Sequence, residues 1–412
     1  TFAPIDKDHG RPLNDPKNRF SGDNAAGWAA ISDHIVLWDY LIDFSGGGYL
    51  MPYPSVYAMA ETIQYIAQFP AFKGYFGQHM HGLEGPVSTG LNDLRAWVAA
   101  RLLWNPDQDY RQLIDQFLEG YYGPAAPYIA EYIERLHDSF AQSDSTLRIS
   151  TPITSSYLTF DLLYEADRLF AQAEAAVADQ PDFLRHVQRA RVDVDYVILM
   201  RSVELAREAM RRHVDWDIDY DNRLARFKEH TAHVQYYKIG STMASLYEVL
   251  DIKRTVPPVP DIVEGLPESD WVDLQDNTFW LYPPVGATLV NDPKASDNAA
   301  ARVKGSTNEW AIQLPGATLP REGRWKLYAS VRIDPGDGAP GDKAFDYGIW
   351  PPFEHTASAD YADFADGEYH WVEFPWIYQY DPAYSSRYAW LAPPNSTAIQ
   401  YLYVDRIIAV RQ

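Results

Sequence analysis

The sequence predicts a multidomain protein with an α/β part, a helical part and a β part, in that order along 412 residues. Up to residue 106, apolar runs of strand length alternate with amphipathic helices. Helical spacing of apolar residues then continues, and the last region consists of short stretches in which apolar and polar residues alternate. A chain this long also exceeds a single ordinary core. We therefore expect the later strands of a (β/α)8-type barrel at 1–106, a helical bundle at 107–254 and a β-sandwich at 271–412.

The first region contains two strand-and-helix repeats. The run "HIVLWDYLIDF" (34–44) has strand length and leads into a glycine-rich loop, and helical spacing follows at 56–69. A second short strand begins "FKGYFGQHMHG" (72–82) and precedes a helix at 89–106, which Pro106 ends. Because two strands cannot close a barrel, we expect only part of one here.

The second region reads as consecutive helices. In "DQDYRQLIDQFLEGYYG" (107–123), Asp109 is a candidate N-cap and Gly123 a candidate stop. Longer helices are expected at roughly 155–178, 181–213 and 219–250. Their polar faces are most simply solvated, so this region is expected to be a bundle without chemistry of its own.

A proline-rich connector and a β domain complete the chain. The connector "TVPPVPDIVEGLPESD" (255–270) is expected to be semi-rigid. Alternating stretches such as "RWKLYASVRI" and "AIQYLYVDRIIAV" follow it, separated by turn residues. This region holds eight of the 13 tryptophans. Sugar rings stack on flat aromatic faces, so the sandwich is a candidate carbohydrate-binding module, although a tryptophan is more often core.

Composition argues against several classes of partner and cofactor. A net charge of −22 disfavours nucleic acids and anionic membranes, and no apolar run reaches the length of a membrane span. Cysteine is absent, which removes disulfides, thiolate metal sites and a cysteine nucleophile. No phosphate-binding glycine motif occurs in the required context, so we expect no cofactor.

Two histidines raise the question of a metal. His79 and His81 in "QHMHG" would point to one side of a strand, but two ligands make only half of a zinc site. We therefore predict no metal and expect His79 to be a hydrogen-bond donor in a cleft. A metal-dependent hydrolase remains the third hypothesis.

Carboxylates are the better candidates for chemistry. Asp6 lies in "FAPIDKDHGRP" (2–12), and Asp39 and Asp43 lie at or just beyond the end of the first predicted strand, where barrel enzymes place catalytic groups. Capping a loop is the alternative use of such a carboxylate.

The stretch "LNDLRAWVAARLLWNPDQDYRQLIDQFLEGYYGPAAPYI" (91–129) resembles the domain-of-unknown-function 4838 family. "HIVLWDYLIDF", "PYPSVYAMAETIQYIA" and "FKGYFGQ" fit that family in the same order, so the resemblance covers about residues 1–140. Its members are large exported bacterial proteins whose barrel looks like that of the α-glucuronidases of glycoside hydrolase family 67. The resemblance therefore implies a secreted or periplasmic location.

The resemblance also implies candidate catalytic residues. In the α-glucuronidases, two later carboxylates activate water, in segments similar to "PID" and "EYTGQ". Here Asp6 stands in "PID" and Asp43 in "DFSGG" (43–47), where a shorter Asp replaces a Glu. Many relatives also have Glu where this chain has Gly77. The general acid and the earlier barrel strands are implied to lie outside these residues, in an N-terminal half of the same protein.

Three functions follow as hypotheses. The first is a glycoside hydrolase acting on a polysaccharide or oligosaccharide, with uronic-acid-containing glycans among the expected substrates, by carboxylate-assisted attack of water. The second is a noncatalytic glycan-binding or scaffold protein with a degenerate barrel, and the third is the metal-dependent hydrolase. The substrate-binding candidates are His9, Arg11, Trp38, Asp39, Gln78 and His79, of which His9 and Arg11 suit sugar hydroxyls or carboxylates.

Overall fold

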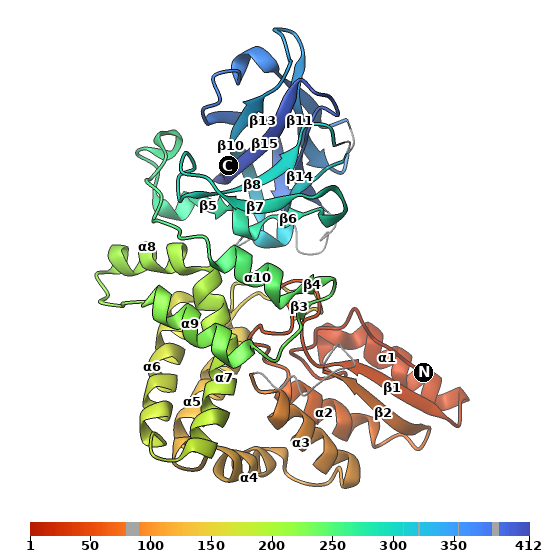
Figure 1. Cartoon of the computed structure of the whole chain (residues 1–412). Helices are drawn as coiled ribbons and strands as arrows, with labels where there is room; N and C mark the ends of the chain where they lie inside the picture. The colour runs from red at the N-terminus through yellow and green to blue at the C-terminus, as the bar shows by residue number, and fades with distance from the viewer. Residues whose placement is uncertain (80–89, 308, 320–321, 353, 381–386) are drawn as a thin grey trace. The chain divides into compact units, whose positions relative to one another are not determined.

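The computed structural model describes residues 1–79, 90–307, 309–319, 322–352, 354–380 and 387–412. The chain folds as two compact units, Thr1–Tyr247 and Glu248–Gln412. The first is mixed α/β and mainly helical, and the second consists of antiparallel sheets (Figure 1). The expectation of mixed α/β structure followed by a β-rich C-terminal part is therefore confirmed, and the strands and helices of residues 1–247 belong to one unit.

The first unit begins with parallel strands. β1 (Ile35–Tyr40) pairs in parallel with β2 (Phe72–Gln78), and Phe2 forms a parallel bridge to Leu37 on the other side of β1. Helix α1 (Arg19–Ile31) connects the Phe2 segment to β1, and α2 (Val56–Ile66) connects β1 to β2. The strands β1 and β2 and the helix α2 were predicted from the sequence, whereas α1 was not.

The two faces of β1 differ in their surroundings. Ile35, Leu37 and Asp39 are buried, whereas Val36 and Trp38 are exposed. Leu37 packs in one cluster with Ala25 of α1 and Ile66 of α2, so both connecting helices cover the same face of the strands.

The rest of the first unit is helical apart from one small hairpin. The elements are α3 (Asn92–Trp104), α4 (Tyr110–Tyr122), α5 (Ala126–Gln142), α6 (Phe160–Ala176), α7 (Pro181–Met200), α8 (Ser202–Arg212), α9 (Tyr220–Thr231), β3 (Tyr236–Lys238), β4 (Ser241–Thr242) and α10 (Met243–Leu250). Helix α4 has the predicted ends, because Asp109 accepts hydrogen bonds from the backbone N–H groups of Arg111 and Gln112 and the helix stops at Gly123, whose φ is +54°.

Two of the long predicted helices are interrupted. The span 181–213 breaks at Arg201, whose guanidinium donates hydrogen bonds to the carbonyls of Leu158 (2.6 Å) and Ile153 (3.3 Å). The span 219–250 contains the β3–β4 hairpin, which turns at Gly240 with φ of +75°. Helical periodicity does not predict these breaks: a tertiary contact accompanies the first, and a glycine with positive φ permits the second.

The second unit contains two antiparallel sheets. One has the order β13–β10–β15–β8–β7, with β5 also paired to β15, and the other has the order β12–β11–β14–β9–β6. The strands are β5 (Trp271–Gln275), β6 (Trp280–Leu281), β7 (Thr288–Asn291), β8 (Ala299–Lys304), β9 (Ile312–Pro315), β10 (Gly323–Pro335), β11 (Lys343–Trp350), β12 (Thr356–Asp360), β13 (His370–Tyr380), β14 (Tyr388–Ala392) and β15 (Ile399–Arg411).

One hydrophobic core joins the two sheets. It includes Trp325 and Leu327 of β10 and Phe374 of β13 from the larger sheet, and Phe345 and Ile349 of β11 from the smaller. Along β11, these residues alternate with Asp346, Gly348 and Trp350, which therefore face away from the core. The outer face of the five-stranded sheet is thus available for other contacts.

The proline-rich segment is anchored to the second unit. The guanidinium of Arg254 forms ion pairs of 2.5 Å with the buried carboxylates of Asp276 and Asp297. Thr255 donates its N–H to the Asp297 carbonyl, and the Pro258 carbonyl accepts from Arg406. The start of this segment is therefore held by charge and hydrogen bonds, in addition to the stiffness of its prolines.

Candidate functional site

Asp39 belongs to a buried cluster on the helix-covered side of β1. Its Oδ1 lies 2.9 Å from Nζ of Lys7, with both side chains almost fully buried, and its Oδ2 accepts a hydrogen bond from Tyr75 (3.3 Å). His9 is also buried, with Nδ1 3.9 Å from the same carboxylate. Burial, and then the charge of Lys7, lower the pKa of His9 to about 4, so its ring is neutral at pH 7. This cluster satisfies its own charges internally.

Asp43 holds the loop that follows β1. Its Oδ1 accepts hydrogen bonds from the N–H groups of Gly46 (2.9 Å) and Gly48 (2.7 Å), and the residue is 1% exposed. Gly48 has φ of +86°, a conformation that favours glycine. Burial raises the pKa of the Asp43 carboxyl well above its ordinary value. In this structure the carboxyl contacts its own loop and has almost no contact with solvent.

The other candidates in the opening segment have different surroundings. Asp6 is exposed, so the two predicted catalytic carboxylates differ strongly in their access to water. Arg11 is 3.3 Å from the Asp8 carboxylate and lies over the ring of Phe140, 5.6 Å from its centroid. Arg11 is therefore already paired with an acid and an aromatic ring.

A second group of predicted residues lies on the opposite face of β1 and β2. Trp38 donates from Nε1 to Oε1 of Gln78 (2.8 Å), packs edge-on against Phe76 (5.0 Å between centroids) and stacks on Tyr40 (6.1 Å). Val36 extends this surface, which we call the open face: Val36, Trp38, Tyr40, Phe76 and Gln78. The structure thus places Trp38 and Gln78 together and separates them from Asp39 and His9.

Of the two histidines considered as metal ligands, the structure describes His79. His79 is within 3.2 Å of the Gly77 carbonyl through Nδ1, and His81 lies outside the described residues. Within the described parts of the chain, no group of three or more His, Cys, Asp or Glu side chains is arranged to hold a metal ion.

The second unit contains a pocket whose lining residues were not predicted from the sequence. It has a volume of about 460 Å³ and lies on the outer face of the five-stranded sheet. Every strand of that sheet contributes to it: Trp280 from β6, Gln313 from β9, Trp390 and Ala392 from β14, Lys343 and Asp346 from β11, and Thr356 from β12. We call this the aromatic pocket.

Strand register places much of this lining in one row. Trp280 pairs with Gln313, Gln313 with Trp390, Trp390 with Gly348, and Gly348 with Thr356. The row therefore crosses all five strands, which at about 4.8 Å between neighbouring strands is a length of about 19 Å. An extended ligand can lie along it, across the strand direction.

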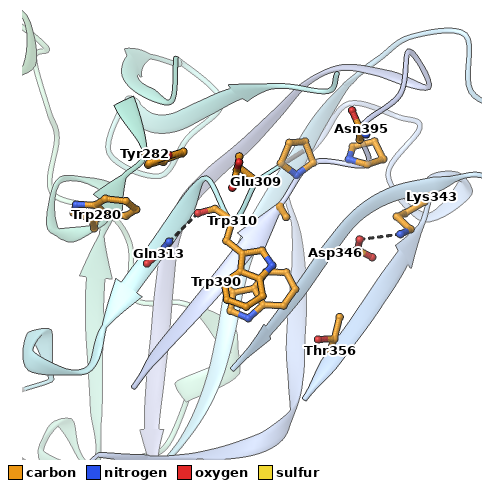
Figure 2. A pocket seen from close by; sticks show the side chains of 13 residues that line it. Trp280, Tyr282, Glu309, Trp310, Gln313, Lys343, Asp346, Thr356, Trp390 and Asn395 are labelled. Atoms are coloured by element: carbon orange, nitrogen blue, oxygen red, sulfur yellow. Dashed lines mark hydrogen bonds and ion pairs between the residues drawn. The ribbon is translucent and has the colours of Figure 1, made fainter. Parts of the chain in front are cut away.

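Aromatic rings form two platforms along this row. Trp310 stacks on Trp390, with ring centroids 4.6 Å apart and planes 14° apart, and Trp390 itself is buried. Trp280 and Tyr282 form the other platform, 5.5 Å between centroids, and Trp280 is 43% exposed. Figure 2 shows Trp280 and Tyr282 at one side of the pocket and the Trp310–Trp390 pair near its middle.

Two neighbours determine how the central platform lies. Gln313 donates from its side-chain amide to the Trp310 carbonyl (2.9 Å), which fixes the backbone that carries the ring. At Gly348, an added Cβ would lie 2.8 Å from Cζ2 of Trp390. The absence of a side chain at 348 therefore lets the Trp390 ring rest on the sheet.

Polar groups surround these rings. Lys343 and Asp346 form an ion pair (2.8 Å), and Thr356, Asn395 and Glu309 also line the pocket. Figure 2 shows the ion pair and Thr356 on the side opposite Trp280. Flat apolar rings beside hydroxyl, amide and charged groups are able to stack on one face of a ligand while hydrogen-bonding its edges.

Comparison with known protein families identifies the beginning of the chain. Residues 1–134 match the model of a domain of unknown function, DUF4838. This DUF4838 region contains the parallel strands, the open face and the Asp39 cluster, and its assignment confirms the family expected from the sequence. No curated protein sequence gave a significant match.

Three solved structures are similar to part of the chain. The CBM22-1 xylan-binding domain from Paenibacillus barcinonensis Xyn10C is 14% identical over 34% of this chain and 94% of its own, with a TM-score of 0.25. The CBM22-1-CBM22-2 tandem domain of the same protein is 14% identical over 34% of this chain and 43% of its own (TM-score 0.24). The CBM22-1-GH10 modules of Clostridium thermocellum Xyn10B, complexed with xylohexaose, are 13% identical over 35% and 26% (TM-score 0.21).

None of the described helices combines the length and apolar character required to cross a bilayer.

Proposed function

We propose that the protein binds a carbohydrate chain in the aromatic pocket of its second unit. The observation that carries this proposal is the row across five strands, with its two aromatic platforms. Sugar rings have apolar faces and hydroxyl edges. A pocket that combines stacked indoles with amide and hydroxyl groups complements both properties.

The proposal is tested by replacing Trp310, the partly exposed ring of the central platform. Trp310→Ala removes the surface on which a sugar ring would stack, so glycan affinity should fall about 30-fold, which corresponds to about 2 kcal/mol. Native gels containing xylan, mixed-linkage β-glucan or glucomannan provide the screen, and titration calorimetry with the full chain gives the affinity.

Trp28→Ala is the matched control, because it removes an exposed indole from α1 of the first unit and leaves the pocket intact. It should retain the affinity of the unmodified chain. If Trp310→Ala binds as tightly as the unmodified chain, the pocket is not the binding site. If no glycan in the panel retards the unmodified chain, the proposal is wrong.

The structure also favours a second candidate function, glycoside hydrolysis at the carboxyl ends of the parallel strands. The Phe2 segment, β1 and β2 are successive parallel neighbours, and both connecting helices cover the same face. A (β/α)8-type barrel has this arrangement throughout, so it supports the barrel, although one half of a doubly wound sheet has the same arrangement. On this proposal, the open face is the inward side, covered by further parallel strands, since parallel sheets are normally buried on both faces.

In this second candidate, Asp6 and Asp43 activate water and Trp38, Gln78 and His79 contact the sugar. The DUF4838 match supports it, and a secreted or periplasmic location belongs to it. Asp43→Asn and Asp6→Asn test it in the longest available form of the protein, on neutral and uronic-acid oligosaccharides. Loss of turnover in either variant supports catalysis, and unchanged turnover removes that residue from it. The present burial of Asp43 makes glycan binding the better supported function.

A further inference from the structure

The charges that line the aromatic pocket are arranged to disfavour an acidic ligand. Among its thirteen described lining residues, Lys343 is the one cation. Its Nζ is 2.8 Å from Oδ2 of Asp346, so its charge is already compensated. Glu309 adds a further negative charge to the lining, in a chain whose net charge is −22.

A sugar carboxylate would therefore meet repulsion at this surface. Lys343 could offer it only a charge that Asp346 already compensates, so the pair would give the ligand carboxylate little net attraction. The other oxygen of Asp346 accepts a hydrogen bond from Ser358 (2.5 Å), so the carboxylate is held in place on the sheet. An acidic ligand would face this fixed charge and that of Glu309 with no unpaired cation from the lining.

The remaining polar lining suits uncharged sugars. Gln313, Thr356 and Asn395 carry amide and hydroxyl groups, which can both donate and accept hydrogen bonds, as sugar hydroxyls do. None of these groups needs an ionised partner. These side chains are thus suited to the recognition of hydroxyl groups.

The spacing of the platforms sets a minimum length for the ligand. Trp280 and Trp390 both pair with Gln313 and flank it on neighbouring strands, so their backbones are two strand spacings apart, about 10 Å. A single sugar ring can rest on one platform, but contact with both requires several linked sugars. Affinity is then expected to rise steeply once the chain spans both.

We infer that the aromatic pocket selects an uncharged glycan segment of several sugar units, laid across the strands from Trp280 to Thr356, and rejects segments that carry uronic acids. This inference rests on the proposed glycan binding and specifies its ligand class.

The test compares ligands of equal length and different charge on the full chain. Calorimetric titrations use xylo- and cello-oligosaccharides of one to six units and oligogalacturonates of the same lengths. We expect the best neutral hexamer to bind at least tenfold more tightly than the acidic hexamer, and the monosaccharides to show no measurable binding. Glu309→Gln should increase affinity for the acidic hexamer about fivefold, because it removes one repulsive charge.

A charge-matched control separates local from global effects. Glu373→Gln changes the net charge by the same amount, but Glu373 lies on β13 of the other sheet, paired with Lys326. It should leave the affinity for the acidic hexamer unchanged. An equal gain in both variants would assign the discrimination to the net charge of the protein and overturn the inference.

The outcomes distinguish this inference from the function on which it rests. If the acidic hexamer binds as tightly as the neutral ones and Trp310→Ala abolishes that binding, the pocket binds glycans and the charge selection is wrong. If monosaccharides bind as tightly as hexamers, the two-platform arrangement is wrong. If no oligosaccharide binds, the proposed function fails and the inference fails with it.

Discussion

The open face of β1 and β2 and the aromatic pocket of the second unit both present tryptophan to solvent, but in different surroundings. On the open face, Trp38 uses its indole N–H on Gln78 and otherwise packs against rings. In the pocket, the Trp310–Trp390 pair is bordered by amide, hydroxyl and charged side chains. The open face consists mainly of apolar groups packed against one another, as in an interior surface, whereas the pocket resembles a binding site.

This difference shows that aromatic content alone does not identify a sugar site. What distinguishes the pocket is its concave shape together with hydrogen-bonding groups beside the rings. An apolar sheet face without such groups gains most from burial against other apolar side chains. The first of three predictions perturbs the region beneath the open face, and the other two perturb the second unit.

The largest expected effect is on the stability of the region beneath the open face. Lys7→Met leaves the carboxylate of Asp39 buried without its cation, so the free energy of unfolding of the first unit should fall by about 3–5 kcal/mol. Urea denaturation followed by circular dichroism measures it. Glycan affinity of the second unit should not change.

Lys17→Met is the control for Lys7→Met, because Lys17 is exposed and its loss should cost less than about 0.5 kcal/mol. Equal stability of the two variants would show that the Lys7–Asp39 pair is not required.

In the second unit, we expect a pH-dependent change in the free energy of unfolding that is of similar size. Burial raises the pKa of Asp405 to about 7, and its carboxyl accepts hydrogen bonds from Ser296 (2.8 Å) and Ser330 (3.0 Å). The folded state therefore binds a proton more tightly than the unfolded state. This contribution to stability is fully present below about pH 4 and is lost as pH rises to about 7, a change of up to about 4 kcal/mol.

Asp405→Asn removes the titrating group, so the stability of the unmodified chain relative to this variant should decline between pH 4 and pH 8. Chemical denaturation at a series of pH values measures the difference. Exposed Asp363→Asn serves as the reference and should leave the pH profile as it is. A parallel pH profile for Asp405→Asn and the unmodified chain would contradict the prediction.

The smallest expected effect concerns the floor of the pocket. Gly348→Ala forces the new methyl group against the Trp390 ring and the His355 carbonyl, so stability should fall by about 1–3 kcal/mol and glycan affinity should also decrease. Gly120→Ala in α4 meets no atom within 4 Å and should be neutral or stabilising. Unchanged affinity in Gly348→Ala would mean that the ring position is not important for binding.

The sequence predicted the elements of the first unit better than their roles. The apolar run at 34–44 marked β1, and Asp109 with Gly123 marked α4, because these are local properties of the chain. The face of the sheet to which each side chain points was harder to predict. Trp38 and Asp39 were both expected to contact substrate, but neighbouring residues on a strand point to opposite faces, and only Trp38 reaches the open face.

The pocket could not be predicted at the level of residues. The density of tryptophan after residue 270 indicated the correct region, but Trp310 and Trp390 are 80 positions apart and meet only through sheet pairing. The role of Gly348 depends on the register of β11 with β14, which no local pattern specifies. Side chains alternate between the two faces of a strand, and Trp390 lies between the core residues Ala389 and Leu391. This alternation did indicate that Trp390 faces away from the core.

The row across the five-stranded sheet has a consequence for how this protein can evolve. Each strand supplies one position to the row, and the flanking positions, such as Tyr347 and Ile349 on β11, pack in or against the core. Substitutions at Trp280, Gln313 or Thr356 would therefore change ligand contacts one strand at a time without disturbing core packing. Ligand preference in this unit is open to stepwise selection, with Gly348 as the position least free to vary.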